Sequence, residues 1–188
     1  MGHLNADQLA AGLEHVRAAP RQAGLLACIV QRPEIGERHV LHAARLDATV
    51  GLVGDNWLSR GNRRTPDGSA VPGKQVTVMN ARLAQLVAGG TERIALAGDQ
   101  LYVDFDISID NLPTGSRLRV GEAVLQVSDI PHLGCAKFVE HYGEDAMRFV
   151  NSRLGRQLRL RGVNTVVVTP GDIRVGDTVT PVQAFVKT

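Results

Sequence analysis

One cysteine with a histidine and a lysine close by is the part of this sequence best suited to chemistry. Cys135 follows Pro131 and Gly134, where a strand pattern ends and a helical pattern begins. Backbone N–H groups at a helix start, together with His132 and Lys137, favour the thiolate, which is the nucleophilic and metal-binding form of cysteine. The alternative role is a buried, inert thiol, the usual fate of a free cysteine. We treat Cys135, His132 and Lys137 as candidate catalytic residues.

The second cysteine and the absence of targeting signals limit the kinds of protein that this chain can be. Cys28, the second cysteine, lies in the apolar run 25–30 and is interpreted as a core residue. Residues 1–22 lack the apolar stretch and cleavage site of a secretory signal, and no apolar run is long enough to cross a bilayer. We therefore expect reduced thiols and a cytoplasmic protein without membrane association. His132 and Cys135 have no second ligand pair at zinc-site spacing, so a closed zinc site is not predicted.

The basic residues are mostly arginine, with eighteen Arg against three Lys. Planar guanidinium groups suit phosphate and carboxylate ligands, whereas a solvated surface is the alternative role. The formal net charge of +2 and the 4% aromatic content argue against a nucleic-acid partner. Walker and dinucleotide-binding motifs are absent. Two clusters are the candidate anion-binding groups: Arg60, Arg63 and Arg64 in a Gly-rich loop, and Arg156, Arg159 and Arg161 after the last predicted helix.

Hydrophobic periodicity predicts many short strands and few helices. A helix is expected over about 6–18, begun by Asn5 and Gln8 as a capping box, with further helices over 80–88, 136–142 and 144–154. Strands are expected over 24–31, 39–46, 74–79, 101–110, 117–120, 123–130, 163–169, 173–175 and 178–182. The strand over 101–110 alternates strictly, so its aspartates are assigned to a solvent-exposed face. This pattern indicates a mostly-β barrel or sandwich, not a doubly wound sheet.

An ordered set of short segments resembles a known family. The segments are Gly51–Asp55, Gln75–Val78, Ala97–Leu101, Leu112–Leu118, Val120–Val127, Pro131–Lys137 and Val175–Val179. Together they resemble the MOSC domain family, named for the C-terminal domain of molybdenum cofactor sulfurase, and specifically its stand-alone, bacterial-type members. The resemblance implies a β-barrel-like MOSC core with a few short helices, including an N-terminal helix. It divides the chain into an N-terminal helical extension, residues 1–22, and a MOSC-like domain, residues 23–188.

The resemblance also implies a cofactor and a role for Cys135. This residue stands at the family's usual cysteine position, which implies that it ligates molybdenum or carries sulfur for metal–sulfur centres. The arginine clusters, with Asp99 in the Ala97–Leu101 segment, are then expected to bind molybdenum cofactor through its anionic pterin phosphate. In cofactor sulfurases a pyridoxal-phosphate desulfurase domain precedes the MOSC domain. Because no lysine here has a recognisable pyridoxal-phosphate setting, we expect that cofactor only on a partner, either a cysteine desulfurase or, for electrons, a reductase.

Two other functions remain open at this stage. One is a non-catalytic binding module for an anionic small molecule or a partner protein, in which Cys135 is inert. The other is molybdenum-dependent reduction of N-hydroxylated compounds, which some relatives perform. The enzyme classes to distinguish are therefore a sulfur transferase and a reductase component, and no feature of the sequence sets the oligomeric state.

Overall fold

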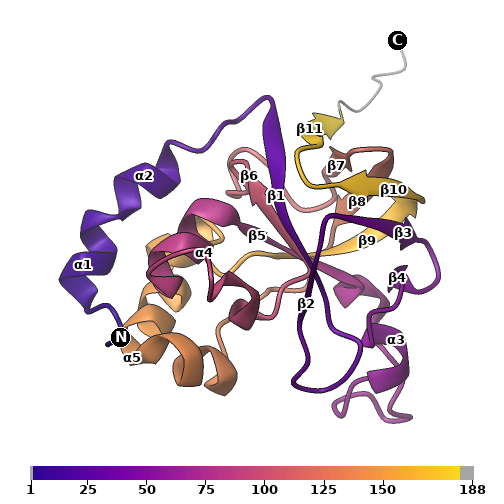
Figure 1. Cartoon of the computed structure of the whole chain (residues 1–188), viewed down its shortest axis with the longest axis horizontal. Helices are drawn as coiled ribbons and strands as arrows, with labels where there is room; N and C mark the ends of the chain where they lie inside the picture. The colour runs from indigo at the N-terminus through magenta and orange to yellow at the C-terminus, as the bar shows by residue number, and fades with distance from the viewer. Residues whose placement is uncertain (1, 183–188) are drawn as a thin grey trace.

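A closed barrel of seven strands forms the centre of the molecule. The computed structural model describes residues 2–182 (Figure 1), so residues 183–188 of the predicted domain lie outside the described part. The order around the barrel is β11, β7, β8, β9, β5, β6 and β1, and pairing of β1 with β11 closes it. The bounds are β1 Gly24–Gln31, β5 Val76–Asn80, β6 Leu101–Asp104, β7 Arg117–Val120, β8 Ala123–Val127, β9 Val163–Thr169 and β11 Thr178–Val182. The predicted barrel is thus confirmed.

The remaining strands extend or flank the barrel. β2 (His39–Leu41) pairs with β1 beyond the closed part. A small sheet of β10 (Gly171–Arg174), β3 (Ala43–Asp47) and β4 (Gly51–Leu52) lies beside it (Figure 1). The barrel interior is filled by aliphatic side chains, of which Leu26, Val78 and Leu125 are fully buried. At roughly 25 cal/mol per Å² of apolar surface, this burial is the main force that holds the strands together.

Helices cover one side of the barrel and form a second apolar core with it. They are α1 (Ala6–Ala11), α2 (Leu13–Arg17), α4 (Ala81–Ala88), α5 (Ala136–Asn151) and α6 (Arg153–Gln157), the group on the left of Figure 1. Leu9 of α1 and Val16 of α2 are buried in this core with Phe138 and Tyr142 of α5. The N-terminal extension therefore packs onto the domain through shared apolar burial.

Three further short helices complete the described chain. α3 spans Trp57–Arg60, and two 3-10 helices, η1 and η2, span Pro72–Lys74 and Ile94–Ala97. Among residues 2–182 no helix is both long and apolar enough to cross a membrane.

Local sequence signals account for several helix ends. The predicted capping box is present, because the Asn5 side chain accepts a hydrogen bond from the Gln8 backbone and the Gln8 side chain accepts one from the Asn5 backbone. The single helix expected over 6–18 is instead two helices that meet at Gly12. Asn80 caps α4 by accepting a hydrogen bond from Leu83 N at 3.1 Å. α5 is kinked at Gly143, where φ is +88°.

The strand expected over 101–110 is shorter and more buried than its alternation predicted. β6 ends at Asp104, and both Tyr102 and Val103 are fully buried, on the helical and the barrel side respectively. Tyr102 donates a hydrogen bond to the Ile94 carbonyl at 3.0 Å. Beyond Asp104 the chain turns, with Asp106 accepting a hydrogen bond from Ser108 N at 2.9 Å. Tertiary packing on both faces therefore overrides the pattern of a half-exposed strand.

Two glycines of similar φ allow backbone strain to be separated from steric contact. Gly162, before β9, has φ +99°, and a Cβ there would lie 2.5 Å from the Val78 carbonyl oxygen. Gly176, before β11, has φ +94° and no atom within 4 Å of such a Cβ. We predict that Gly176→Ala lowers the free energy of unfolding by about 1–2 kcal/mol through strain. Gly162→Ala should lower it by about 1–3 kcal/mol more, because the backbone must also shift. Urea unfolding measures both losses. Equal losses would show that contact with the Val78 carbonyl adds no cost at Gly162.

Candidate functional site

Cys135 lies where α5 begins. It is the N-cap residue, with extended backbone, and its carbonyl accepts hydrogen bonds from Phe138 N at 2.9 Å and Val139 N at 3.1 Å. Its side chain is exposed and makes no capping hydrogen bond. The thiol thus lies at the start of a helix, as the sequence predicted, and it is exposed to solvent, not buried in the core.

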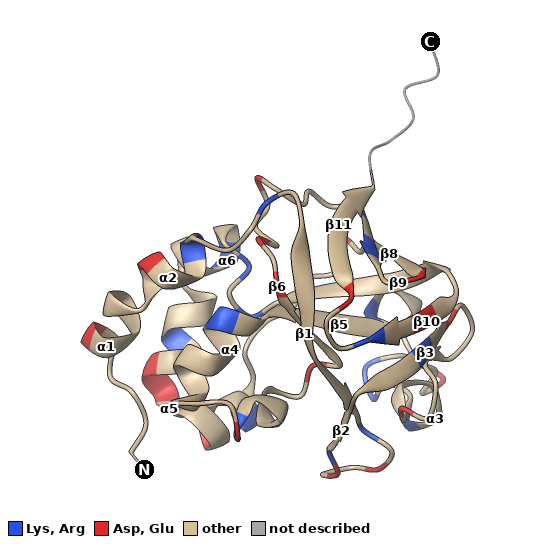
Figure 2. Cartoon of the chain, turned by 45° about the horizontal axis from the view of Figure 1, so that its top comes forward, with Lys and Arg blue, Asp and Glu red and all other residues tan. Residues whose placement is uncertain are grey.

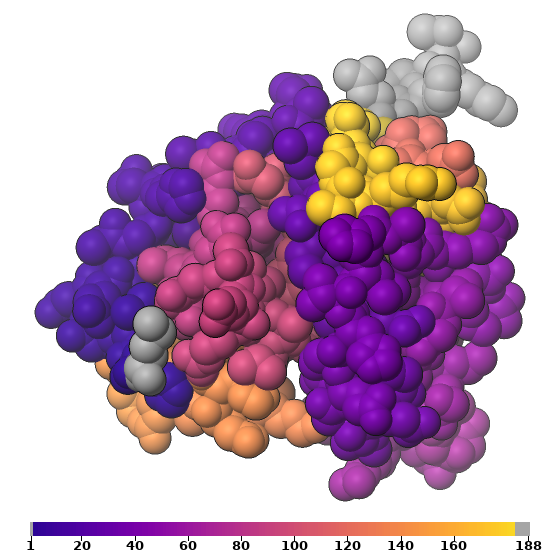
Figure 3. Space-filling view, in the orientation of Figure 1, coloured from indigo at the N-terminus to yellow at the C-terminus, as the bar shows by residue number. Residues whose placement is uncertain are grey.

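A cavity of about 530 Å³ opens beside this cysteine, and we call it the arginine cavity. Its walls come from the segment after β1, the loop around α3, η1, the turn after η2, the segment 131–135 and the start of α5. In the space-filling view the surface is hollowed where the purple part of the chain meets the pink and orange parts (Figure 3). Seven cationic residues line it: Arg32, Arg38, Arg60, Arg64, Lys74, Lys137 and Arg161. None of its described lining residues is Asp or Glu.

Positive charge gathers in the arginine cavity and not over one outer face of the protein. Figure 2 shows basic positions on both the helical and the barrel side, with acidic positions among them. The chain as a whole carries a formal net charge of only +2. The arginine cavity is therefore the place where positive charge gathers without nearby compensation from the residues that line it.

Arg32 is neutralised from behind by a buried carboxylate. Its Nε and Nη2 donate to the two oxygens of Asp55, each at 2.8 Å, and its Nη1 donates to the Gly98 carbonyl at 2.7 Å. Asp55 also accepts hydrogen bonds from Arg32 N at 3.0 Å and Trp57 N at 2.9 Å. This bidentate pair fixes the start of α3 against the end of β1.

Arg161 is held by a second buried carboxylate, that of Asp99. Its Nη1 donates to Asp99 Oδ2 at 2.6 Å and its Nη2 to the Ala97 carbonyl at 2.9 Å. The guanidinium lies 5.1 Å from the centre of the Phe138 ring, within cation–π range. Asp99 is fully buried, and this burial raises its pKa, although Arg161 opposes the shift. Asp99 therefore acts behind the cavity wall and does not line it.

The other cations of the cavity have no carboxylate partner among residues 2–182. They are Arg38, Arg60, Arg64, Lys74 and Lys137, none of which forms a salt bridge there. Burial, and next the charge of Arg32, lower the pKa values of Arg38 and Arg60. The charge of Asp55 opposes both shifts but does not cancel them. Arg38 Nε is buried and has no hydrogen-bond partner in the described residues.

His132 is neutral in this setting. Its Nδ1 lies 3.4 Å from Asp99 Oδ1, but neither atom makes a hydrogen bond to a described residue. Burial, followed by the charges of Arg161, Arg32 and Lys74, holds the pKa of His132 well below its ordinary value. A neutral imidazole is able to accept a hydrogen bond from a bound molecule.

The structure brings together some of the sequence-predicted site residues and separates others. Cys135, Lys137, His132, Arg60, Arg64 and Arg161 all line the arginine cavity. Arg63 is exposed on the same loop as Arg60 but does not line the cavity. Arg156 and Arg159 line a different cavity, of which Arg161 is also part of the wall. Cys28, on β1, is partly buried as expected, and burial raises its pKa.

Sequence reasoning missed three of the cavity's cations. Arg32, Arg38 and Lys74 are spread over two segments and form no cluster along the chain. One usable signal was present, since Arg32 directly follows an apolar strand and Asp55 belongs to the Gly51–Asp55 segment. The pairing of these two residues nevertheless depends on the fold that brings β1 and α3 together.

The neutral state of His132 predicts a dependence of stability on pH. In the unfolded chain this residue takes up a proton near pH 6.5, whereas the folded protein keeps it neutral well below that pH. The unfolded state then binds more protons, so stability falls as pH drops below about 6.5, by up to about 1.4 kcal/mol per pH unit for one group. We predict that His132→Asn flattens this part of the profile. Urea unfolding of both proteins between about pH 5 and 7 tests it, and parallel profiles would contradict it.

Comparison with known proteins agrees with this architecture. A profile of the MOSC domain matches residues 67–180, which is more than half of the chain. No curated protein sequence matches it. Among solved structures, the YuaD protein from Bacillus subtilis is similar with a TM-score of 0.62 and 16% identity, over 86% of this chain and 97% of that one.

YiiM proteins share the fold as well. YiiM from Escherichia coli has a TM-score of 0.54 and 20% identity, over 85% of this chain and 70% of that one. YiiM from Geobacillus stearothermophilus has a TM-score of 0.54 and 15% identity, over 87% and 75%. At these identities the likeness concerns the fold. With the sequence match over residues 67–180, the barrel and its cysteine-bearing segment, we conclude that the chain belongs to the MOSC domain family.

Proposed function

We propose that this protein binds molybdenum cofactor in the arginine cavity and uses Cys135 as a molybdenum ligand or sulfur carrier. MOSC domains are associated with this cofactor. The observation that carries the proposal is the composition of the cavity: seven cations, no carboxylate among its described lining residues, and an exposed thiol beside them. A volume of about 530 Å³ is within the usual range for small-molecule sites, roughly 300–1,000 Å³.

The residues present fit such a cofactor. Its anionic phosphate suits cations without carboxylate partners, and Arg60, Arg64 and Lys74 are the ones we assign to it. The buried Arg38 Nε, which has no hydrogen-bond partner in the described residues, is a donor that a ligand oxygen would satisfy. A thiolate is the soft ligand that suits molybdenum. When bound, the cofactor supplies a metal that accepts sulfur ligands and exchanges electrons.

The protein's own groups divide the remaining work. Arg32 and Arg161 shape the wall at the end of η2, because Asp55 and Asp99 hold their charges and each guanidinium donates to a carbonyl there, Gly98 and Ala97 respectively. Lys137, on the first turn of α5, places positive charge near Cys135. His132 offers a neutral imidazole to the same cavity. Arg63, Arg156 and Arg159 do not line this cavity and carry no part of the proposal.

Sulfur transfer requires a donor, and we propose a cysteine desulfurase as that partner. The Cys135 thiolate attacks the outer sulfur of the donor's persulfide. A new S–S bond forms on Cys135 while the donor's S–S bond breaks, and the donor leaves as a thiolate. The two sulfur oxidation levels are exchanged, so no further oxidant is needed. Pyridoxal phosphate stays with the donor, and a cytoplasmic location supplies the reducing conditions that keep Cys135 available.

Replacing Cys135 tests the sulfur-carrying role. After incubation with a cysteine desulfurase and cysteine, we predict that the wild-type protein holds sulfane sulfur and that Cys135→Ser holds none. Cys28→Ser is the matched control, because Cys28 lies on β1 and does not line the cavity. Cold cyanolysis measures the sulfur. Equal loading of Cys135→Ser and wild type would exclude Cys135 as the carrier, and retained cofactor binding by that variant would then favour the binding-module function.

The loop arginines test the anion site separately. We predict that Arg60→Gln with Arg64→Gln weakens inorganic pyrophosphate binding at least about tenfold at low salt, because two charges are lost from the cavity. Arg63→Gln, on the same loop but outside the cavity lining, should change it less than about twofold. Isothermal titration calorimetry measures both. Equal weakening by Arg63→Gln would show that binding follows the general charge of the loop instead of the cavity.

A further inference from the structure

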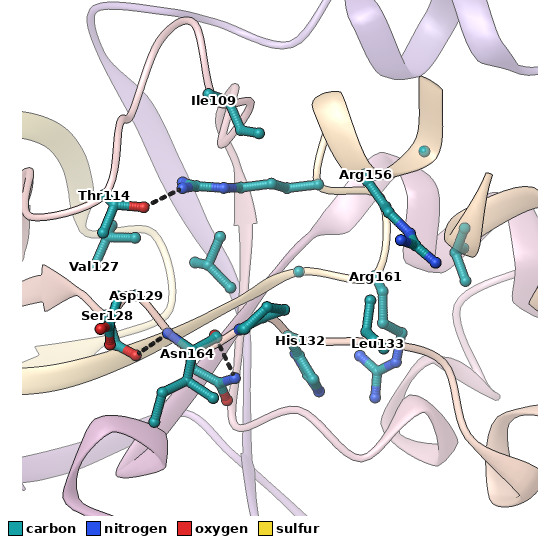
Figure 4. A pocket seen from close by; sticks show the side chains of 17 residues that line it. Ile109, Thr114, Val127, Ser128, Asp129, His132, Leu133, Arg156, Arg161 and Asn164 are labelled. Atoms are coloured by element: carbon teal, nitrogen blue, oxygen red, sulfur yellow. Dashed lines mark hydrogen bonds between the residues drawn. The ribbon is translucent and has the colours of Figure 1, made fainter. Parts of the chain in front are cut away.

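A second cavity of about 300 Å³ lies on the other side of the segment 131–133. It is bounded by the ends of β8 and β9, the residues 128–133 and the region of α6 (Figure 4). Most of its side-chain surface is aliphatic, from Ile109, Val127, Ile130, Leu133, Val150 and Val163. Three arginines and one carboxylate, that of Asp129, complete the charged groups of its described lining.

We propose that this second cavity binds a small organic acid with a flat apolar body of about two fused rings, whose carboxylate pairs with Arg156. Because a dry apolar cavity of roughly 150 Å³ holds one benzene ring, twice that volume suits a two-ring body. The site is separate from the function proposed for the arginine cavity, and it requires neither molybdenum nor Cys135.

Arg156 is the arginine that remains available to a ligand. Arg159 donates to the Leu112 carbonyl at 2.5 Å and to Thr114 Oγ1 at 3.3 Å. Arg161 is bound to Asp99. Arg156 uses only Nε, which donates to the Asn151 carbonyl at 3.0 Å, so its two terminal nitrogens make no hydrogen bond within residues 2–182. Figure 4 shows this side chain extending from α6 toward Leu133 and Arg161, along the cavity wall.

The uncharged polar groups of the wall are largely engaged with each other. Ser128 Oγ accepts a hydrogen bond from Ile130 N at 2.9 Å, and Asn164 Nδ2 donates to the Ile130 carbonyl at 3.0 Å (Figure 4). Ser128 N donates to the Asn164 carbonyl at 3.0 Å. A ligand would therefore be bound by apolar contacts and by one guanidinium. This combination suits a molecule with an apolar body and a single acidic group. A sugar or a polyphosphate needs more free donors than this wall provides.

The test uses 2-naphthoate and its uncharged analogue 2-naphthamide as probes. We predict that the full chain binds both, and that Arg156→Gln weakens 2-naphthoate at least about fivefold while leaving 2-naphthamide within about twofold. Arg153→Gln, on the same short helix but not lining the cavity, should leave both unchanged. Calorimetry gives the affinities, and amide chemical shifts of the labelled protein give the location, expected at Leu133, Val163 and Asn164.

A second variant keeps the test independent of Arg156. Ile109 is 45% exposed at the cavity and sits in no strand or helix, so Ile109→Trp should fold and partly fill the space. It is expected to abolish binding of both probes. The proposal is overturned if neither probe binds at millimolar concentration, if Arg156→Gln binds 2-naphthoate as tightly as wild type, or if the shifts fall on Arg60 and Lys137. Retained naphthoate binding by Cys135→Ser separates this site from the arginine cavity.

Discussion

The buried ion pair between Asp99 and Arg161 is the interaction on which both cavities depend. Asp99 lies with no exposed surface between η2 and β6, and Arg161 stands just before β9. Removing either partner of such a pair leaves an uncompensated buried charge, which costs roughly 3–5 kcal/mol. Phe138, in the first turn of α5, packs against the Arg161 guanidinium, so the pair also contacts the start of this helix.

The same arrangement explains why the arginine cavity is so strongly positive. The two carboxylates near it, Asp55 and Asp99, are committed to Arg32 and Arg161 behind the walls, with hydrogen bonds of 2.6–2.8 Å. They stabilise the shape of the cavity, and the attraction of Asp55 opposes the lowering of the Arg38 and Arg60 pKa values without cancelling it. Charge of this kind weakens the folded state through repulsion unless a ligand compensates it. The anion binding proposed for this cavity would relieve this cost.

Much of the fold could be predicted because local signals and packing agree. The strand over 24–31 is β1 with the same bounds, Asn80 caps α4, and the helical interruption between Tyr142 and Glu144 is the kink at Gly143. The helix start at Cys135 could also be predicted, from the residues next to it in the sequence. The cation set could not be predicted, because Arg32, after β1, and Lys74, before β5, come together only when both strands pair with β6. The predicted half-exposed strand over 101–110 was wrong because tertiary contacts, which the sequence pattern does not show, bury both faces of β6.

The arginines of the second cluster, Arg156, Arg159 and Arg161, lie close together in the sequence but do not all line the same cavity. Arg159 has φ +50° and Gly162 has φ +99°, so the chain turns sharply between α6 and β9. Arg156 and Arg159 consequently line only the second cavity, while Arg161 forms part of both. The segment from Pro131 to Leu133 is shared in the same way and leads directly into Cys135. Residues that are adjacent along the chain can therefore line different cavities, and their spacing in the sequence does not assign them to one site.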